Sequence, residues 1–228
     1  MTSDLLVQFA HLPTLTHLEM HYFDVDYDIL KNQAVPLASV RSLTIECPTA
    51  FDEKVKEDEE EEKKNKPTDG GPFAGILSKL FPNLDNLTIS FDEEEKDYTL
   101  LSPDMLVKLA RLEHLTELTL DWIRIDLDIL ESFALKSEAL FPNIRVLCLG
   151  RIAYSSFAPI GAQFCRVIST LFPALTEVSF RFTHDESSTD TLYDVNSFRE
   201  LAKSQFVASF DSAAFVNLKM NKFEVSID

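Results

Sequence analysis

Residues 112–120 read Leu-Glu-His-Leu-Thr-Glu-Leu-Thr-Leu, with apolar side chains spaced three, three and two residues apart. In Leu118-Thr119-Leu120 the two leucines point to the same face of an extended strand, because side chains alternate across a strand. The full spacing recurs six times along the chain and a seventh time in part, and it begins at Leu12, Leu37, Phe81, Leu112, Phe141, Phe172 and Phe215. These starts lie 25 to 44 residues apart. Each copy therefore predicts one short strand, and the longer intervals predict insertions in the connecting loops.

Apolar segments between the strands predict helices, at residues 4–10, 73–80, 104–111, 127–140, 161–171 and 196–203. Ser102-Pro103-Asp104 has the composition of a helix start, with a Ser cap, Pro at the first helical position and an acid in the first turn. Phe-Pro-Asn or Phe-Pro-Ala follows three of the helices, where the proline ends the helix and turns the chain toward the next strand. A repeated strand–helix unit predicts an α/β fold with one parallel sheet and helices outside it.

A longer repeat is also present. Residues Ala10–Leu30 and Ala110–Leu130 are identical at 9 of 21 positions at an offset of 100. Phe215–Ile227 matches again at an offset of 200, which predicts a last strand with Leu218 and Met220 facing inward. The third copy stops at residue 228, so we expect either an uncapped end or a piece of a longer protein.

The repeats resemble a known family. The register with long helical returns resembles ribonuclease-inhibitor-like leucine-rich repeats, and Phe-Pro-Asn-Leu-x-x-Leu-x-Ile (residues 81–89) is similar to the repeat region of F-box proteins. The resemblance covers nearly all of residues 3–227. It implies a right-handed solenoid with one curved parallel sheet and helices on the convex side. The F-box itself is not visible, because the first strand begins near His17 and leaves no room for a three-helix module.

The composition excludes several classes of protein. The net charge is −17, and binding to phosphates needs a face of clustered Lys and Arg, so we expect no nucleic-acid partner. Only 5 glycines occur, and no phosphate-binding glycine motif is present. The 3 cysteines are scattered and predict no disulfide framework, which favours the cytoplasm or nucleus. No apolar run is long enough to span a membrane.

The residues between and beside the inward pairs should stand on the open face of the sheet, which we expect to be either a solvated surface or a partner-binding surface. The candidate binding residues are His17, Glu19, His21, Glu46, Thr88, Glu117, Thr119, Asp121, Trp122, Glu177 and Arg181. His17 and His21 would lie about 13 Å apart along one strand, too far to share a metal ion. We expect no metal, no cofactor and no catalytic site, because Cys148 has no matched base and no carboxylate has an apolar pocket.

Three acidic segments, residues 52–66, 92–97 and 185–190, carry −10 of the net charge. Each follows a predicted strand, so all three should project from one edge of the sheet. Residues 52–72 have no apolar period, and we expect this insertion in the single repeat domain of residues 1–228 to be disordered. These segments serve either as solubilising charge or to steer a basic partner.

Two functions remain open. One is a non-catalytic protein–protein interaction module of the F-box type, which recognises substrates of a ubiquitin-like conjugation pathway and binds a Skp-type adaptor only if an F-box lies outside this chain. The other is a stand-alone acidic scaffold or chaperone for a basic protein.

Overall fold

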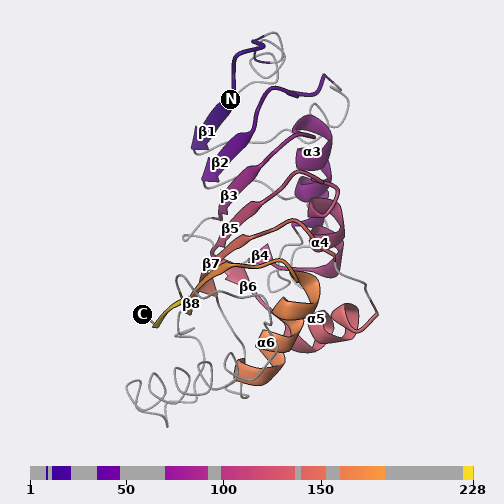
Figure 1. Ribbon diagram of the computed structural model, residues 1–228, viewed down its shortest axis with the longest axis vertical. Helices are drawn as coiled ribbons and strands as arrows, with labels where there is room; N and C mark the ends of the chain where they lie inside the picture. The colour runs from indigo at the N-terminus through magenta and orange to yellow at the C-terminus, as the bar shows by residue number, and fades with distance from the viewer. Residues whose placement is uncertain are drawn as a thin grey trace, which may run out of the picture.

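The computed structural model describes residue 9 and residues 12–21, 35–46, 70–91, 99–136, 140–152, 160–182 and 223–227. Its main element is a seven-stranded sheet in the order β1-β2-β3-β5-β7-β8-β9, in which all neighbours are parallel (Figure 1). The strands are β1 His17–His21, β2 Ser42–Glu46, β3 Asn86–Ser90, β5 Glu117–Asp121, β7 Val146–Ile152, β8 Glu177–Phe182 and β9 Phe223–Ile227. The expected α/β fold with one main parallel sheet is confirmed.

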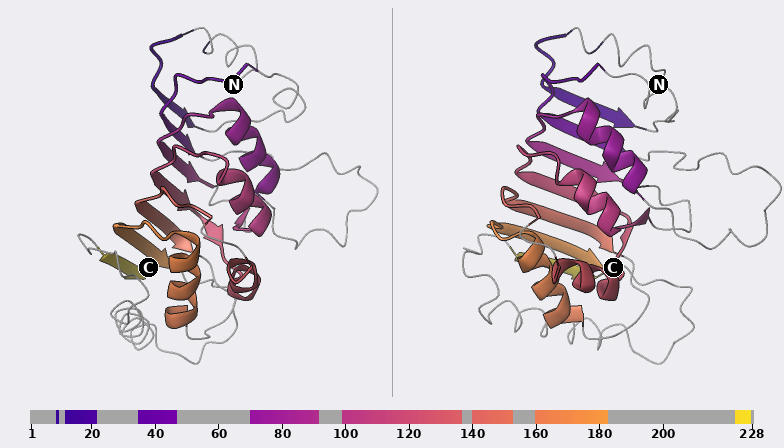
Figure 2. Two further views of the ribbon diagram at one scale, coloured as in Figure 1. Left: turned by 45° about the vertical axis from the view of Figure 1, so that its right-hand side comes forward. Right: turned by 90° about the vertical axis from the view of Figure 1, so that its right-hand side faces the viewer.

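Helices lie along one side of this sheet, and the sheet's other face carries no helix among the described residues (Figure 2). The helices are α3 Gly71–Leu80, α4 Pro103–Leu109, α5 Leu127–Ala134 and α6 Ile160–Leu171. Each begins within two residues of its predicted start, and α5 is shorter than predicted. A second, two-stranded parallel sheet joins β4 (Thr99–Leu100) to β6 (Ile123–Arg124). The helices expected at 4–10 (except Phe9) and 196–203, and the acidic segments (52–66, 92–97 and 185–190), fall outside the described residues. Helix α3 begins at Gly71, so the last two residues of the insertion expected at 52–72 are helical.

The spacing of three, three and two has a direct structural cause. The first interval is a tight turn, in which Leu115 N donates to Leu112 O at 3.0 Å and Val40 N donates to Leu37 O at 3.1 Å. The second interval carries the chain from the turn into the strand. The third is the strand itself, where Leu118 and Leu120 are 0% and 1% exposed. Apolar residues at these positions therefore meet in one continuous core cluster.

A second backbone device joins each strand to the next at the strand entry. Asp85 O accepts from both Thr116 N (2.8 Å) and Glu117 N (3.1 Å). Arg145 O accepts in the same way from Thr176 N (2.8 Å) and Glu177 N (3.0 Å). Because each carbonyl takes two amides, the strand entries hold the same register across the sheet.

Helix α4 begins as its sequence predicts. Ser102 has an extended backbone and its Oγ accepts a hydrogen bond from Met105 N at 3.1 Å, with Pro103 in the first turn. Asp104 also pairs with Lys108 one turn later, at 2.6 Å. The bond to Ser102 satisfies an amide that the helix itself leaves unbonded and fixes where the helix begins.

The last strand differs from the prediction. The repeat spacing places it around Leu218 and Met220, whereas β9 spans Phe223–Ile227 and pairs with β8 through Val178↔Phe223 and Phe180↔Val225. Residues 215–221 lie outside the described part of the chain. Both segments have an apolar–polar–apolar alternation, which does not discriminate between them. Aromatic and β-branched residues are concentrated in 223–227, and they favour a strand.

Candidate interaction surface

The strand register arranges the outward side chains of the sheet in three rows. The first row contains His17, Ser42, Asn86, Glu117, Val146 and Glu177. The central row contains Glu19, Thr44, Thr88, Thr119, Cys148 and Ser179. The third row contains His21, Glu46, Ser90, Asp121 and Gly150. We call these three rows the open face. All of these residues are exposed or half-buried except Gly150, which is buried. Arg181, the remaining strand candidate, lies in β8 and pairs with Ser226 of β9. The side chain of Arg181 lies outside the described part.

Three of the predicted residues meet at the β1 edge of this face. His21 Nδ1 lies 2.6 Å from Glu46 Oε2 on the neighbouring strand, and His21 Nε2 lies 3.9 Å from Glu19 Oε2. Glu46 is therefore engaged within the protein, which the sequence interpretation did not foresee. An alignment of the first two repeats pairs His21 with Glu46, so the contact could have been found from the sequence. Among the described residues, no group of three His, Cys, Asp or Glu side chains could hold a metal ion.

Asp121, Trp122 and Gly150 form a bend at the end of β5. Trp122 has φ 59°, the only positive value for a non-glycine residue in the described part of the chain. Its N–H donates to Asp121 Oδ1 at 3.0 Å and to Gly150 O at 3.1 Å. A Cβ on Gly150 would lie 2.6 Å from Asp121 Oδ1, so only glycine leaves room for that carboxylate. The Trp122 side chain is half-buried and packs against the core, next to the open face.

Two acidic candidates have a different environment. Glu117 and Glu177 stand in the first row on either side of Val146, in the register Glu117↔Val146↔Glu177. Glu117 is exposed, and Glu177 and Val146 are half-buried. Within the described part of the chain, neither carboxylate has a side-chain hydrogen bond or ion pair. These two carboxylates therefore differ from Glu46 in being available to a partner.

The cysteines differ in burial. Cys165 lies in α6 and is 1% exposed, and burial raises the pKa of its thiol to about 12. A thiol is nucleophilic as the thiolate, so Cys165 is an apolar core residue at neutral pH. Cys148 lies on the central row, half-buried.

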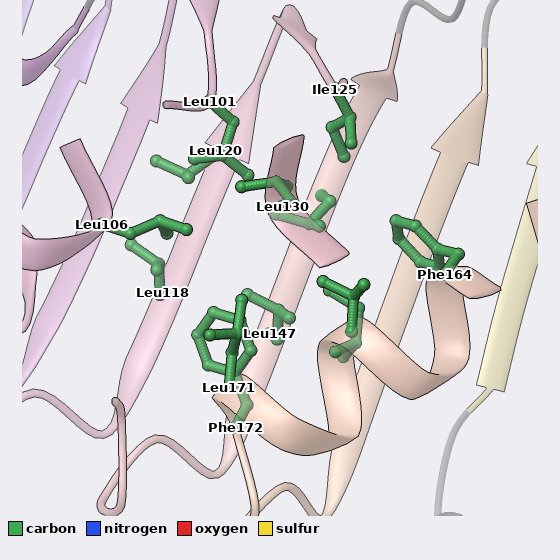
Figure 3. Close-up of a pocket in the computed structure, with 13 residues that line it drawn as sticks. Leu101, Leu106, Leu118, Leu120, Ile125, Leu130, Leu147, Phe164, Leu171 and Phe172 are labelled. Carbon is green, nitrogen blue, oxygen red and sulfur yellow. The ribbon is translucent and has the colours of Figure 1, made fainter. Parts of the chain in front are cut away.

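A cavity lies within the core, between the sheet and helices α4, α5 and α6 (Figure 3). Its lining is apolar throughout and includes Leu106, Leu118, Leu130, Leu147 and Val167. The closed space measures ≈ 10 Å³, which is near the minimum for a single water molecule. With no polar group to orient a ligand and no room for one, this cavity is a gap in packing and not a substrate site.

Comparison of the chain with protein-family models and with curated proteins gives no match. Of the helices in the described part of the chain, none is long and apolar enough to cross a membrane.

Proposed function

We propose that the chain is a non-catalytic protein–protein interaction module built as a right-handed leucine-rich-repeat solenoid, with the open face as its partner surface. The observation that carries this proposal is the register of the three outward rows. These rows cross six strands, which at about 4.8 Å spacing give a continuous face about 24 Å long. Rows of small polar side chains over a buried apolar layer suit recognition of an extended protein surface better than enclosure of a small molecule.

The resemblance to the repeat region of F-box proteins favours substrate recognition in a ubiquitin-like conjugation pathway. The sequence phrase that carries the resemblance corresponds to turns and strands of the sheet, since Phe81 ends α3 and Leu87 and Ile89 face the core from β3. A direct test is capture of a Skp-type adaptor by the full-length product of the gene.

A second candidate is a stand-alone acidic scaffold or chaperone for a basic protein. The charge of the open face favours it, because five of its described side chains are carboxylates and none is Lys or Arg. The net charge of −17 adds a long-range attraction for a basic partner, which salt screens.

The interaction surface is tested with two matched arginine substitutions. Thr88→Arg places a long cation in the centre of the open face, on β3. Val107→Arg makes the same charge change on α4, where Val107 is 40% exposed on the helical side. Partners captured from lysate by the parent and quantified by mass spectrometry should be lost from Thr88→Arg and retained by Val107→Arg. If Thr88→Arg retains them all, the partner surface is elsewhere.

A further inference from the structure

The charged groups of the open face are not equivalent, and the difference points to where a partner binds. Glu46 is held by His21 at 2.6 Å, and at the strand entries Arg41 lies 3.8 Å from Asp85. A partner that used Glu46 would have to displace an existing contact. Glu117 and Glu177 impose no such cost, because the described part of the chain holds no ion pair or side-chain hydrogen bond to either carboxylate.

We infer that the open face takes an extended, Lys- or Arg-bearing segment of a protein partner, seated over Val146 between Glu117 and Glu177. This inference rests on the proposed function and names its partner class. The three residues lie in one row on β5, β7 and β8, so the backbone positions that bear the two carboxylates are about 9.6 Å apart, with Val146 midway. A cationic side chain crossing β7 would pack its methylene stem on Val146, with its charged head near both carboxylates.

The neighbouring row suits the backbone of such a segment. Thr119 and Ser179 belong to the central row, two residues further along β5 and β8 than the carboxylates. Their hydroxyls lie about 7 Å from the first row and can donate to carbonyls or accept from amides of an extended chain. A nucleic acid would instead bring its phosphates against Glu117 and Glu177, which repel them.

The test uses a fluorescent peptide of alternating lysine and serine, titrated with the full chain at low salt, and the same peptide with glutamate in place of lysine. The variant is the double substitution Glu117→Gln with Glu177→Gln. Its control is Glu113→Gln with Asp128→Asn, which removes the same two charges from exposed positions in the turn before β5 and on α5. In the control, Asp128→Asn keeps an oxygen for the bond that Asp128 Oδ1 accepts from Gln163 Nε2 at 3.2 Å.

We expect the first double variant to bind the lysine peptide about tenfold more weakly and the control less than about twofold more weakly. Val146→Thr should weaken binding several-fold with no change of charge, and the glutamate peptide should not bind.

Three results would overturn the inference: no binding of the lysine peptide by the parent, equal losses in the two double variants, or full binding by Glu117→Gln with Glu177→Gln. Equal losses would mean that only the total charge attracts the peptide. A partner captured from lysate distinguishes failure of this inference from failure of the proposed function. A partner released by Thr88→Arg but bound normally by the Glu117/Glu177 variant contradicts this inference alone. A partner that the Thr88→Arg variant binds as well as the parent does contradicts the proposed function itself.

Discussion

At the scale of single residues, alternation along each strand decides which side chains the fold depends on. Leu118 is 0% exposed on β5 and also lines the core cavity, whereas Thr88 on β3 is half-buried on the open face. We expect Leu118→Asp to unfold the protein, because burial of an unpaired carboxylate costs several kcal/mol against a total stability of about 5–15 kcal/mol. Thr88→Asp should cost about 1 kcal/mol or less, since the carboxylate can remain hydrated. Thermal melts followed by circular dichroism distinguish the two, and a Leu118→Asp melt within a few degrees of the parent would contradict the strand register.

The bend at the end of β5 depends on one glycine for a steric reason. Gly150→Ala places a Cβ 2.6 Å from Asp121 Oδ1 and displaces the carboxylate that accepts from Trp122 N–H. We expect a loss of about 1–2 kcal/mol in the free energy of unfolding, since overpacking outweighs the smaller gain from a stiffer unfolded chain. Urea denaturation of Gly150→Ala, Asp121→Ala and the double variant gives the coupling energy between the two positions. We expect the double variant to lose less stability than the sum of the single losses, by about 0.5 kcal/mol or more. Additive losses would show that the two residues do not clash.

At the scale of the repeat element, asparagine in the Phe-Pro-Asn phrase joins neighbouring turns. Asn83 Nδ2 donates to Ala38 O at 2.9 Å, and Asn143 Nδ2 donates to Glu113 O at 2.8 Å. In both cases the acceptor follows the first apolar residue of the preceding repeat. The third copy of the phrase has Ala174 at this position and lacks the side chain for the bond.

A substitution at Ala174 can introduce the missing hydrogen bond. By repeat alignment the acceptor for Ala174→Asn is the carbonyl of Pro142, so the substitution should add one hydrogen bond between turns. We expect an increase of about 0.5–1.5 kcal/mol in the free energy of unfolding, or about 1–6 °C in Tm. Ala174→Asp has nearly the same shape but cannot donate, and should give no gain. The two proteins are compared by calorimetry, and equal Tm values would mean that the asparagine bond does not form at this turn.

The element scale also shows how far the sequence carries the structure. Positions of β1, β2, β3, β5, β7 and β8 follow from inward apolar pairs, and helix starts follow from caps such as Ser102, because both signals are local. The contacts missed are those that join neighbouring repeats, among them His21–Glu46 and the approach of Asp121 to Gly150. Repeat alignment places these residues opposite each other. It does not give the side-chain conformations that bring them into contact. The repeat spacing misplaces the last strand for a different reason, since two nearby segments have the same alternation.

At the scale of the whole molecule, the sheet is continuous but its helical cover is divided. Helix α3 packs on α4 and α5 packs on α6, whereas α4 and α5 make few contacts with each other. The apolar cavity lies at this junction, with Leu106 of α4 and Leu130 of α5 in its lining. In a structure where each unit packs mainly on its neighbours, a weak junction lets the two sides open separately.

Two matched core truncations test whether the two sides of the α4–α5 junction open separately. Phe164 of α6 is 1% exposed and packs edge-to-face on Phe180, with the two ring centroids 4.8 Å apart. Phe73 of α3 is also 1% exposed. Each Phe→Ala change should cost about 3–5 kcal/mol. We expect Phe164→Ala to raise amide hydrogen exchange mainly in β7, β8, α5 and α6. Phe73→Ala should raise it mainly in β2, β3, α3 and α4. The reason is that the destabilisation spreads through direct packing and is transmitted poorly across the α4–α5 junction. Exchange followed by mass spectrometry of peptides from both sides gives the distribution. If both variants raise exchange equally on the two sides, the sheet and core alone couple the molecule into a single cooperative unit, and the division of the helical layer has no energetic consequence.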